Sequence, residues 1–280
     1  MDNERNLIKN NLAKIRNKYL LQSIFKIVPE SQLFQIIKYN KSLQNRVNIG
    51  MNDYKDYKKI IIEIYPKNLE DKNKFINIPK ENKAHYHIYY NDEKKERKKT
   101  YFKKDKNITK VKVIIDKENK SLSRLFYECK CIEKINFIRF NIKDIYDMSE
   151  MFYGCSSLIE LNLNNFNTNN VIDMKGMFSC CSLLKKLNLS NFNTYNVTSM
   201  ENMFSGCSSL KELNIKYFYT LSVVNMNGMF SNCSSLKQLS INRLDAYNVY
   251  DMRGMLYGCS KELKNKILTR SNNLKLEAIF

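Results

Sequence analysis

Six of the eight cysteines in this chain recur at an interval of 26 residues, with no insertion or deletion between them. They are Cys129, Cys155, Cys181, Cys207, Cys233 and Cys259. A fixed period of this length is typical of repeat proteins, in which each unit is one supersecondary element and neighbouring units stack to bury a continuous core. The spacing therefore predicts that the second half of the chain is a stack of similar units.

Apolar side chains ahead of each cysteine follow a helical spacing. Methionines stand seven and four residues before the last five cysteines, and a phenylalanine, or a leucine in the last unit, stands three before. Positions i, i+3, i+4 and i+7 lie on one helical face. The residue ahead of the first methionine is of a type that caps helices. These capping residues are Asp147, Asp173, Ser199, Asn225 and Asp251. The pattern predicts a short capped helix in every unit.

After each cysteine the apolar residues change to the spacing of a strand. Units beginning at Leu158, Leu184 and Leu210 read L-x-x-L-x-L-x-x-F, with Ile at one position of the third. This matches the leucine-rich-repeat pattern, except that Phe replaces the usual Asn or Cys. We therefore expect an α/β fold, a leucine-rich-repeat solenoid of parallel strands and short helices with about five to six rungs, preceded by a helical segment and a small β-rich region.

The run NNFNTNNVIDMKGMFSCCSLLKKLNLSNFNTYNVTSMENMFSGCSSLKELNI resembles the leucine-rich repeats of the BspA-like family, which occurs in mycoplasmas, other bacteria and some protists. The resemblance extends over residues 121–260. For bacterial members it implies surface proteins that bind host molecules. This chain departs from that setting, because charged residues interrupt the apolar residues of its first 21 positions and no secretory signal is visible.

Composition divides the chain into four expected segments. Residues 1–48 keep helical spacing, residues 49–107 are basic and rich in strand-forming residues, residues 108–260 hold the repeats, and residues 261–280 are expected to form a C-terminal capping helix. Residues 1–128 contain 30 Lys and Arg against 16 Asp and Glu, so +14 of the formal charge of +19 precedes most of the repeats.

A faint resemblance to an F-box is present in residues 19–47, where Leu20, Leu21, Ile24 and Phe25 would belong to a first helix. The early Leu-Pro of that motif is absent. An F-box ahead of repeats would imply a ubiquitin-ligase substrate adaptor.

Catalytic and metal-binding patterns are scarce in the sequence. There is no P-loop, no G-x-G-x-x-G and no Ser, His, Asp constellation, so we expect no enzyme activity and no cofactor. The cysteine column lacks both histidine and CxxC spacing, which favours buried thiols over zinc. His85 and His87 alternate along one expected strand and are candidates to share a metal ion, but no third ligand is evident, so no metal site is predicted.

Residues that alternate with the inward leucines are expected to point to solvent and to bind a partner. They form two rows: Lys134, Glu160, Lys186, Glu212 and Gln238, and beside them Asn136, Asn162, Asn188, Asn214 and Ser240. The chain is accordingly expected to be a non-catalytic protein-protein interaction module or scaffold. An F-box-like adaptor and a BspA-like surface adhesin are the alternatives, and the sequence leaves the partner and the oligomeric state open.

A basic run provides a second candidate surface, for the phosphates of nucleic acid or of an anionic membrane. It comprises Lys94, Lys95, Arg97, Lys98 and Lys99. A solvated hairpin is the alternative, and a protein partner is favoured. No segment has the ~20 apolar residues that span a bilayer. Together with the missing secretory signal, this predicts a cytoplasmic protein with reduced thiols.

Overall fold

The computed structural model describes residues 14–15, 40–47, 59–67, 72–102, 107–116, 119–140, 142, 144–241, 247–268 and 276–278. The chain forms two compact units, Met1–Lys59 and Ile60–Phe280. In the first unit, helix α4 (Lys41–Val47) begins after Asn40, whose side-chain oxygen accepts a hydrogen bond from the Leu43 N–H at 3.0 Å. Apart from α4 and Asn40, the F-box-like stretch lies outside the described residues.

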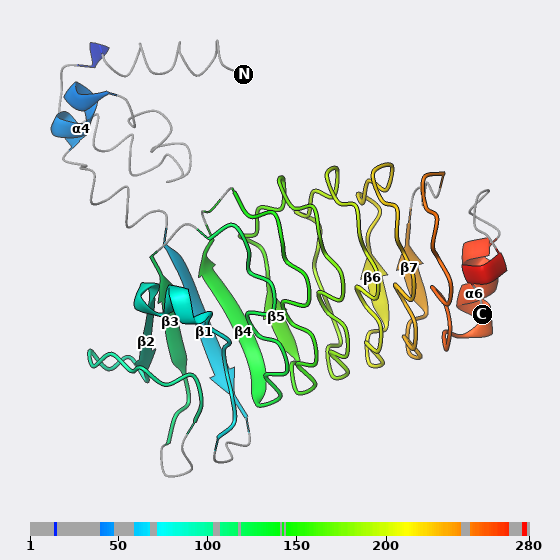
Figure 1. The fold of residues 1–280 in the computed structure, drawn as a ribbon, viewed down its shortest axis with the longest axis horizontal. Helices are drawn as coiled ribbons and strands as arrows, with labels where there is room; N and C mark the ends of the chain where they lie inside the picture. Colours follow the sequence, from blue (N-terminus) through cyan, green and yellow to red (C-terminus); the bar gives the residue numbers. More distant parts are fainter. Residues whose placement is uncertain are drawn as a thin grey trace. The chain divides into compact units, whose positions relative to one another are not determined.

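The second unit opens with an antiparallel sheet, drawn in Figure 1. Strand β1 (Ile60–Pro66) lies between β3 (Val111–Ile115) and β4 (Ile132–Arg139), and β2 (Tyr86–Tyr90) pairs with the other side of β3. Alternate residues of β1, β2 and β3 are buried, as their period-two sequences predict. The short 3-10 helix η1 (Lys80–His85) leads into β2.

A hairpin follows β2 and carries the basic run, for which a hairpin was the alternative interpretation. Asn91 and Asp92 both have positive φ angles, and the Arg97 N–H donates to the Ile88 carbonyl at 2.7 Å across the hairpin. The Asn91 side-chain oxygen also accepts from the backbone N–H groups of Thr109 and Lys110. We name residues 90–99 the basic hairpin.

From β4 onward, 26-residue units lie side by side as rungs of what we name the repeat stack, residues 121–260 (Figure 1). Strand β4 pairs in parallel with β5 (Glu160–Asn162), and β6 (Glu212–Asn214) pairs in parallel with β7 (Gln238–Ser240). Isolated parallel bridges join positions 121, 147, 173, 199, 225 and 251 in sequence. The period read from the cysteines is therefore the step from one rung to the next.

The predicted fold class, an α/β leucine-rich-repeat solenoid of parallel strands with a short helix in each unit, is wrong. The sheet is mixed, with order β2-β3-β1-β4-β5, and its first three pairings are antiparallel. Residues 111–115, which fall in the segment 108–260 expected to hold the repeats, form β3 of this antiparallel part instead. The α-helices whose bounds are described are α4 and α6 (Lys261–Leu268), and the segments from Met to Cys are turns.

Backbone hydrogen bonding explains why turns replace the expected helices. The Phe152 N–H donates to the Met177 carbonyl at 2.9 Å and the Gly154 N–H to the Ser179 carbonyl at 2.8 Å, both in the next rung. An α-helix would instead direct these donors to carbonyls four residues back. Between them, the Cys155 N–H closes a tight turn on the Phe152 carbonyl at 3.2 Å. Every second N–H group of this segment therefore bonds to the next rung. The tight turns between them bring the Met, Phe and Cys side chains to one face, at the same sequence spacing as in a helix.

The repeated apolar columns form the core of the stack. Their methionines, phenylalanines and cysteines are buried in every rung. The phenylalanine rings stack almost parallel on one another at 5.5–5.6 Å between centroids. They are Phe126, Phe152, Phe178, Phe204 and Phe230. The sequence columns correctly identified these side chains as core.

The C-terminal end of the stack is closed by α6 and the 3-10 helix η2 (Leu276–Ala278). Within the segment expected to form a capping helix, Ser260 caps α6 by accepting a hydrogen bond from the Leu263 N–H at 3.2 Å, and Leu263 is buried. The Leu256 N–H donates to the Ala278 carbonyl at 2.7 Å. Carbonyl groups of η2 therefore accept the hydrogen bonds that the N–H groups of the last rung would otherwise donate to a further rung. None of the helices described is long and apolar enough to cross a membrane.

Candidate protein-interaction surface

The two rows of side chains predicted to bind a partner do lie side by side on neighbouring rungs. Lys134 is opposite Glu160 and Asn136 opposite Asn162, while Glu212 is opposite Gln238 and Asn214 opposite Ser240. Lys134 and Asn136 are partly buried, and the other eight residues of the rows are exposed. We name these ten residues the strand face.

Two shallow hollows lie over the strand face. One, of about 550 Å³, is bordered by residues from Lys134 to Asn188. The other, of about 350 Å³, is bordered by residues from Lys186 to Ser240. Lys186 and Asn188 border both, so the hollows form one trough that crosses the rungs.

Charges at the β4 end of the strand face are paired within the chain. Lys134 forms an ion pair with Glu160 at 2.6 Å, and Lys67 pairs with Glu133 at 3.0 Å. The hydrogen bond to Glu160 raises the pKa of Lys134. The Lys134 ammonium also lies 5.8 Å from the centre of the Tyr65 ring. This end of the surface is therefore close to neutral.

The asparagine row has a structural role that the sequence interpretation missed. The side-chain oxygen of Asn162 accepts a hydrogen bond from the Asn164 N–H at 3.1 Å, and Asn188 and Asn214 make the same bond to the residue two positions later. Asn162 also donates to the side-chain oxygen of Asn136 at 2.7 Å. Such bonds are typical of Asn at the start of a turn, a signal that was available in the sequence.

A buried threonine column was also missed. The Thr168 hydroxyl donates to the Asn193 carbonyl at 2.9 Å and accepts from the Asn193 N–H at 2.8 Å. Thr194 makes the same pair of bonds to Tyr219, at 2.9 and 2.8 Å. Recurrence of Thr at positions 168, 194 and 220 was its sequence signal. These hydroxyls replace direct backbone pairing between rungs.

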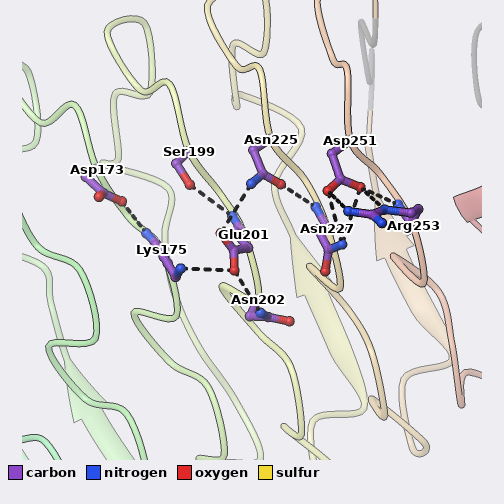
Figure 2. A network of polar contacts seen from close by, with 9 residues as sticks. All are labelled: Asp173, Lys175, Ser199, Glu201, Asn202, Asn225, Asn227, Asp251 and Arg253. Carbon is purple, nitrogen blue, oxygen red and sulfur yellow. Dashed lines mark hydrogen bonds and ion pairs between the residues drawn. The ribbon is translucent and has the colours of Figure 1, made fainter.

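The capping residues of the turns belong to a further polar ladder, of which Figure 2 shows the part from Asp173 to Asp251. As predicted, each accepts a hydrogen bond from a nearby N–H, for example Asp173 from Lys175 at 2.7 Å, although the segment that follows is a turn. The Lys175 ammonium lies 3.1 Å from the Glu201 carboxylate, and Asn225 donates to the same carboxylate at 3.2 Å. Hydrogen bonds from Arg253 lower the pKa of Asp251. The ladder connects rungs and is largely satisfied internally.

Side chains of the basic hairpin, the second predicted surface, are largely engaged with their neighbours. Arg97 pairs with Glu93 and lies 5.5 Å from the Tyr90 ring centre. Lys98 pairs with Glu96 at 2.6 Å. The Lys99 ammonium lies 5.3 Å from the Tyr101 ring centre. Lys94 and Lys95 complete the run and are exposed. Interspersed glutamates weaken the attraction of this hairpin for a polyanion.

His85 and His87 bind the same carboxylate. His85 Nδ1 and His87 Nε2 each lie 3.0 Å from an oxygen of Asp116, and His87 Nδ1 lies 3.4 Å from Glu96. Although partial burial acts to raise it, the hydrogen bonds from both histidines hold the pKa of Asp116 below its usual value. The four groups form a chain rather than a convergent set. Within the described residues, no three His, Cys, Asp or Glu side chains are arranged to hold a metal ion.

The cysteine column is buried, and all eight cysteines are free thiols. From the second rung onward each column thiol donates to a phenylalanine carbonyl of the preceding rung at 3.0–3.2 Å, for example Cys207 to Phe178. Burial raises the pKa of Cys155, Cys181 and Cys207. Only the thiolate reacts readily with electrophiles, so these groups are protected both by burial and by protonation.

We expect one of the eight thiols, the exposed Cys180, to react rapidly with a maleimide in the native protein. All eight should react in denaturant. Intact-mass spectrometry of timed samples measures both numbers, and Cys180→Ser is the control that should remove the fast reaction. Rapid native labelling of several sites, or stoichiometric zinc in the purified protein, would contradict a buried structural column.

The repeat stack coincides with a match to a known family. Residues 120–214 and residues 181–270 each match the family described as Mycoplasma protein of unknown function, DUF285. No curated protein and no solved structure matches the chain. The two segments together span residues 120–270, which is more than half of the 280 residues. The chain therefore belongs to this mycoplasma repeat family.

Proposed function

We propose that the chain is a non-catalytic interaction module that recognises a protein partner through the strand face. The observation that carries this proposal is the alignment of exposed side chains along a trough that crosses successive rungs. Lys186, Glu212 and Gln238 make no side-chain hydrogen bond or ion pair with any other described residue. They are exposed without an internal role, so they are available to a partner.

The size of the strand face suggests how tightly it binds. Five rungs at ~4.8 Å and strands of ~17 Å give about 400 Å². A standard interface buries ~800 Å² on each partner. We therefore expect modest affinity, or a contact that extends onto the turns beside the strands, where Tyr217 and Tyr219 are more than half exposed. The resemblance of the repeats to the BspA-like group is consistent with a binding role.

The triple variant Lys186→Ala, Glu212→Ala, Gln238→Ala is expected to fold normally and to lose the partners that the wild-type chain captures. Exposed substitutions usually change stability by less than ~0.5 kcal/mol each, so a loss of capture reports on recognition. The measurement is affinity purification from cells of the source organism, with quantitative mass spectrometry and a thermal melt of each variant.

The control for this experiment is Glu81→Ala, Lys83→Ala in η1, which likewise removes one acidic and one basic exposed side chain. It should retain every captured protein. If the strand-face variant melts like the wild type and still retrieves the same partners, the strand face is not the recognition surface.

A further inference from the structure

A row of lysines stands at equivalent positions of three consecutive rungs: directly before β6, directly before β7, and at the same place in the rung between β5 and β6. It consists of Lys185, Lys211 and Lys237, which we name the lysine row, and all three are exposed. The Lys237 N–H donates to the Lys211 carbonyl at 2.9 Å, so these two are direct neighbours. The equivalent positions in the first two rungs hold Glu133 and Ile159. The basic character is therefore confined to the C-terminal rungs.

The lysine row is unpaired where the first rungs are paired. No member forms an ion pair with another residue in the described part of the chain. At the β4 end, by contrast, Lys134 pairs with Glu160 and Lys67 with Glu133. Like charges at equivalent positions of adjacent rungs, about 4.8 Å apart, repel one another. An anionic partner would therefore reduce the repulsion among the three ammonium groups of the lysine row.

Neighbouring groups extend the basic row into the trough. Lys186 adds a fourth positive charge and Glu212 one negative charge, so the first two exposed positions of these three rungs carry a net charge of +3. Lys185 and Lys186 both border the larger hollow, whose wall includes Ile159 and Leu161.

Apolar surface lies next to these strands in the same rungs. Lys216 follows β6, and its ammonium lies 4.7 Å from the Tyr217 ring centre, with Tyr217 itself 56% exposed. The rung of Lys211 therefore also carries an exposed ring, and the apolar residues Ile159 and Leu161 lie in the rung before Lys185.

We propose that the lysine row binds an acidic, extended segment of a protein partner, with its carboxylates on the three ammonium groups and an apolar side chain against the trough wall or the Tyr217 ring. This rests on the proposed function and names the class of its partner. Three rungs span about 10 Å, the length of roughly three extended residues. Acidic residues that are close together in the peptide sequence can therefore place their carboxylates along the lysine row. A peptide fits better than nucleic acid, because its carboxylates can be spaced to avoid Glu212, which a continuous phosphate backbone cannot do, and because Ile159 and Leu161 offer an apolar contact beside Lys185.

The test uses the full chain and a fluorescein-labelled Glu-rich peptide with one leucine, compared with the same peptide bearing Gln in place of Glu. Anisotropy at low ionic strength should show binding of the Glu peptide alone. The variant Lys185→Gln, Lys211→Gln, Lys237→Gln should weaken this binding about tenfold, since exposed charge pairs contribute a few-fold each. Its thermal melt should be unchanged or higher, because repulsion along the row is relieved.

The matched control, Lys94→Gln, Lys95→Gln, Lys98→Gln, removes the same charge from the basic hairpin and should bind as the wild type does. Loss of binding in this control, with binding retained by the lysine-row variant, would overturn the inference and assign the anionic ligand to the hairpin. Tighter binding of a single-stranded oligonucleotide than of the Glu peptide would overturn the peptide assignment. If the Glu peptide fails to bind at low salt, the inference is wrong. Partner capture by the Lys186, Glu212, Gln238 variant still decides the proposed function separately.

Discussion

Replacement of Phe204 by Ala is expected to lower the free energy of unfolding by about 3–5 kcal/mol. Phe204 is fully buried, and its ring stacks between Phe178 and Phe230 at 5.6 Å from each. The rungs on either side cannot close on the vacated volume, because bonds such as that from the Phe204 N–H to the Met229 carbonyl fix their separation. The cost should therefore include both the lost transfer free energy and a persistent cavity.

Equilibrium denaturation of the full chain measures this loss, and Phe204→Leu is its control. The last rung already holds Leu256 in the same column, so the leucine variant should lose clearly less than the alanine variant. Because neighbouring rungs support one another in a repeat protein, hydrogen exchange should accelerate in adjacent rungs as well. A loss below about 1 kcal/mol for Phe204→Ala would mean that the phenylalanine column is not a principal part of the core.

Thr194→Val is expected to destabilise the chain by about 2–4 kcal/mol, although valine has the same shape and is more apolar. The Thr194 side chain is fully buried, and its hydroxyl satisfies both the N–H and the carbonyl of Tyr219. Valine leaves both groups, which are partly buried, without that partner, and each such group that stays unsatisfied costs ~1–3 kcal/mol. The measurement is again equilibrium denaturation.

Thr194→Ser provides the matched control, because it keeps both hydrogen bonds and removes only a methyl group, worth ~0.8 kcal/mol. Serine should therefore be tolerated better than valine. The reverse order would show that the site is governed by apolar packing, and that water or a shifted backbone satisfies Tyr219 in the valine variant.

Periodicity in the sequence identified which side chains are buried, because burial recurs at the same position of every rung. The methionine, phenylalanine and cysteine columns and the register of Lys134 with Glu160 were predictable in this way. The cap at Ser260 was predictable from its residue type ahead of a helical segment. The basic hairpin was predictable from its turn residues. All of these features depend on local chain geometry or on the repeat period itself.

Backbone pairing was not predictable from the same pattern. Apolar residues at i, i+3, i+4 and i+7 indicate which side chains face inward. They do not indicate which carbonyl group accepts a hydrogen bond from each backbone N–H. A contrary signal was present inside the expected helices, where one column reads Glu150, Gly176, Asn202, Gly228 and Gly254. All five have positive φ angles, which interrupt an α-helix. Glycine and asparagine in the middle of a helical pattern therefore favoured turns.

The antiparallel sheet depends on partners that local patterns do not identify. Residues 110–115 alternate as a strand in any pairing, and only the full structure shows β3 between β1 and β2. The candidate surface was predictable as two rows of exposed positions. The internal bonds of its asparagine row were not included in that prediction, so Lys186, Glu212 and Gln238 are better positions than the asparagines for testing recognition.

Hydrogen bonds between rungs repeat at the same positions along the turns from Met to Cys, so each of these turns offers the next rung the contacts that it receives from the rung before. Duplication or loss of a whole 26-residue unit would preserve every one of these contacts, provided that the antiparallel sheet and α6 remained at the two ends. The length of the array can therefore change during evolution without redesign of its interior. Each added unit would lengthen the exposed surface by one strand and leave the composition of that strand free to diversify.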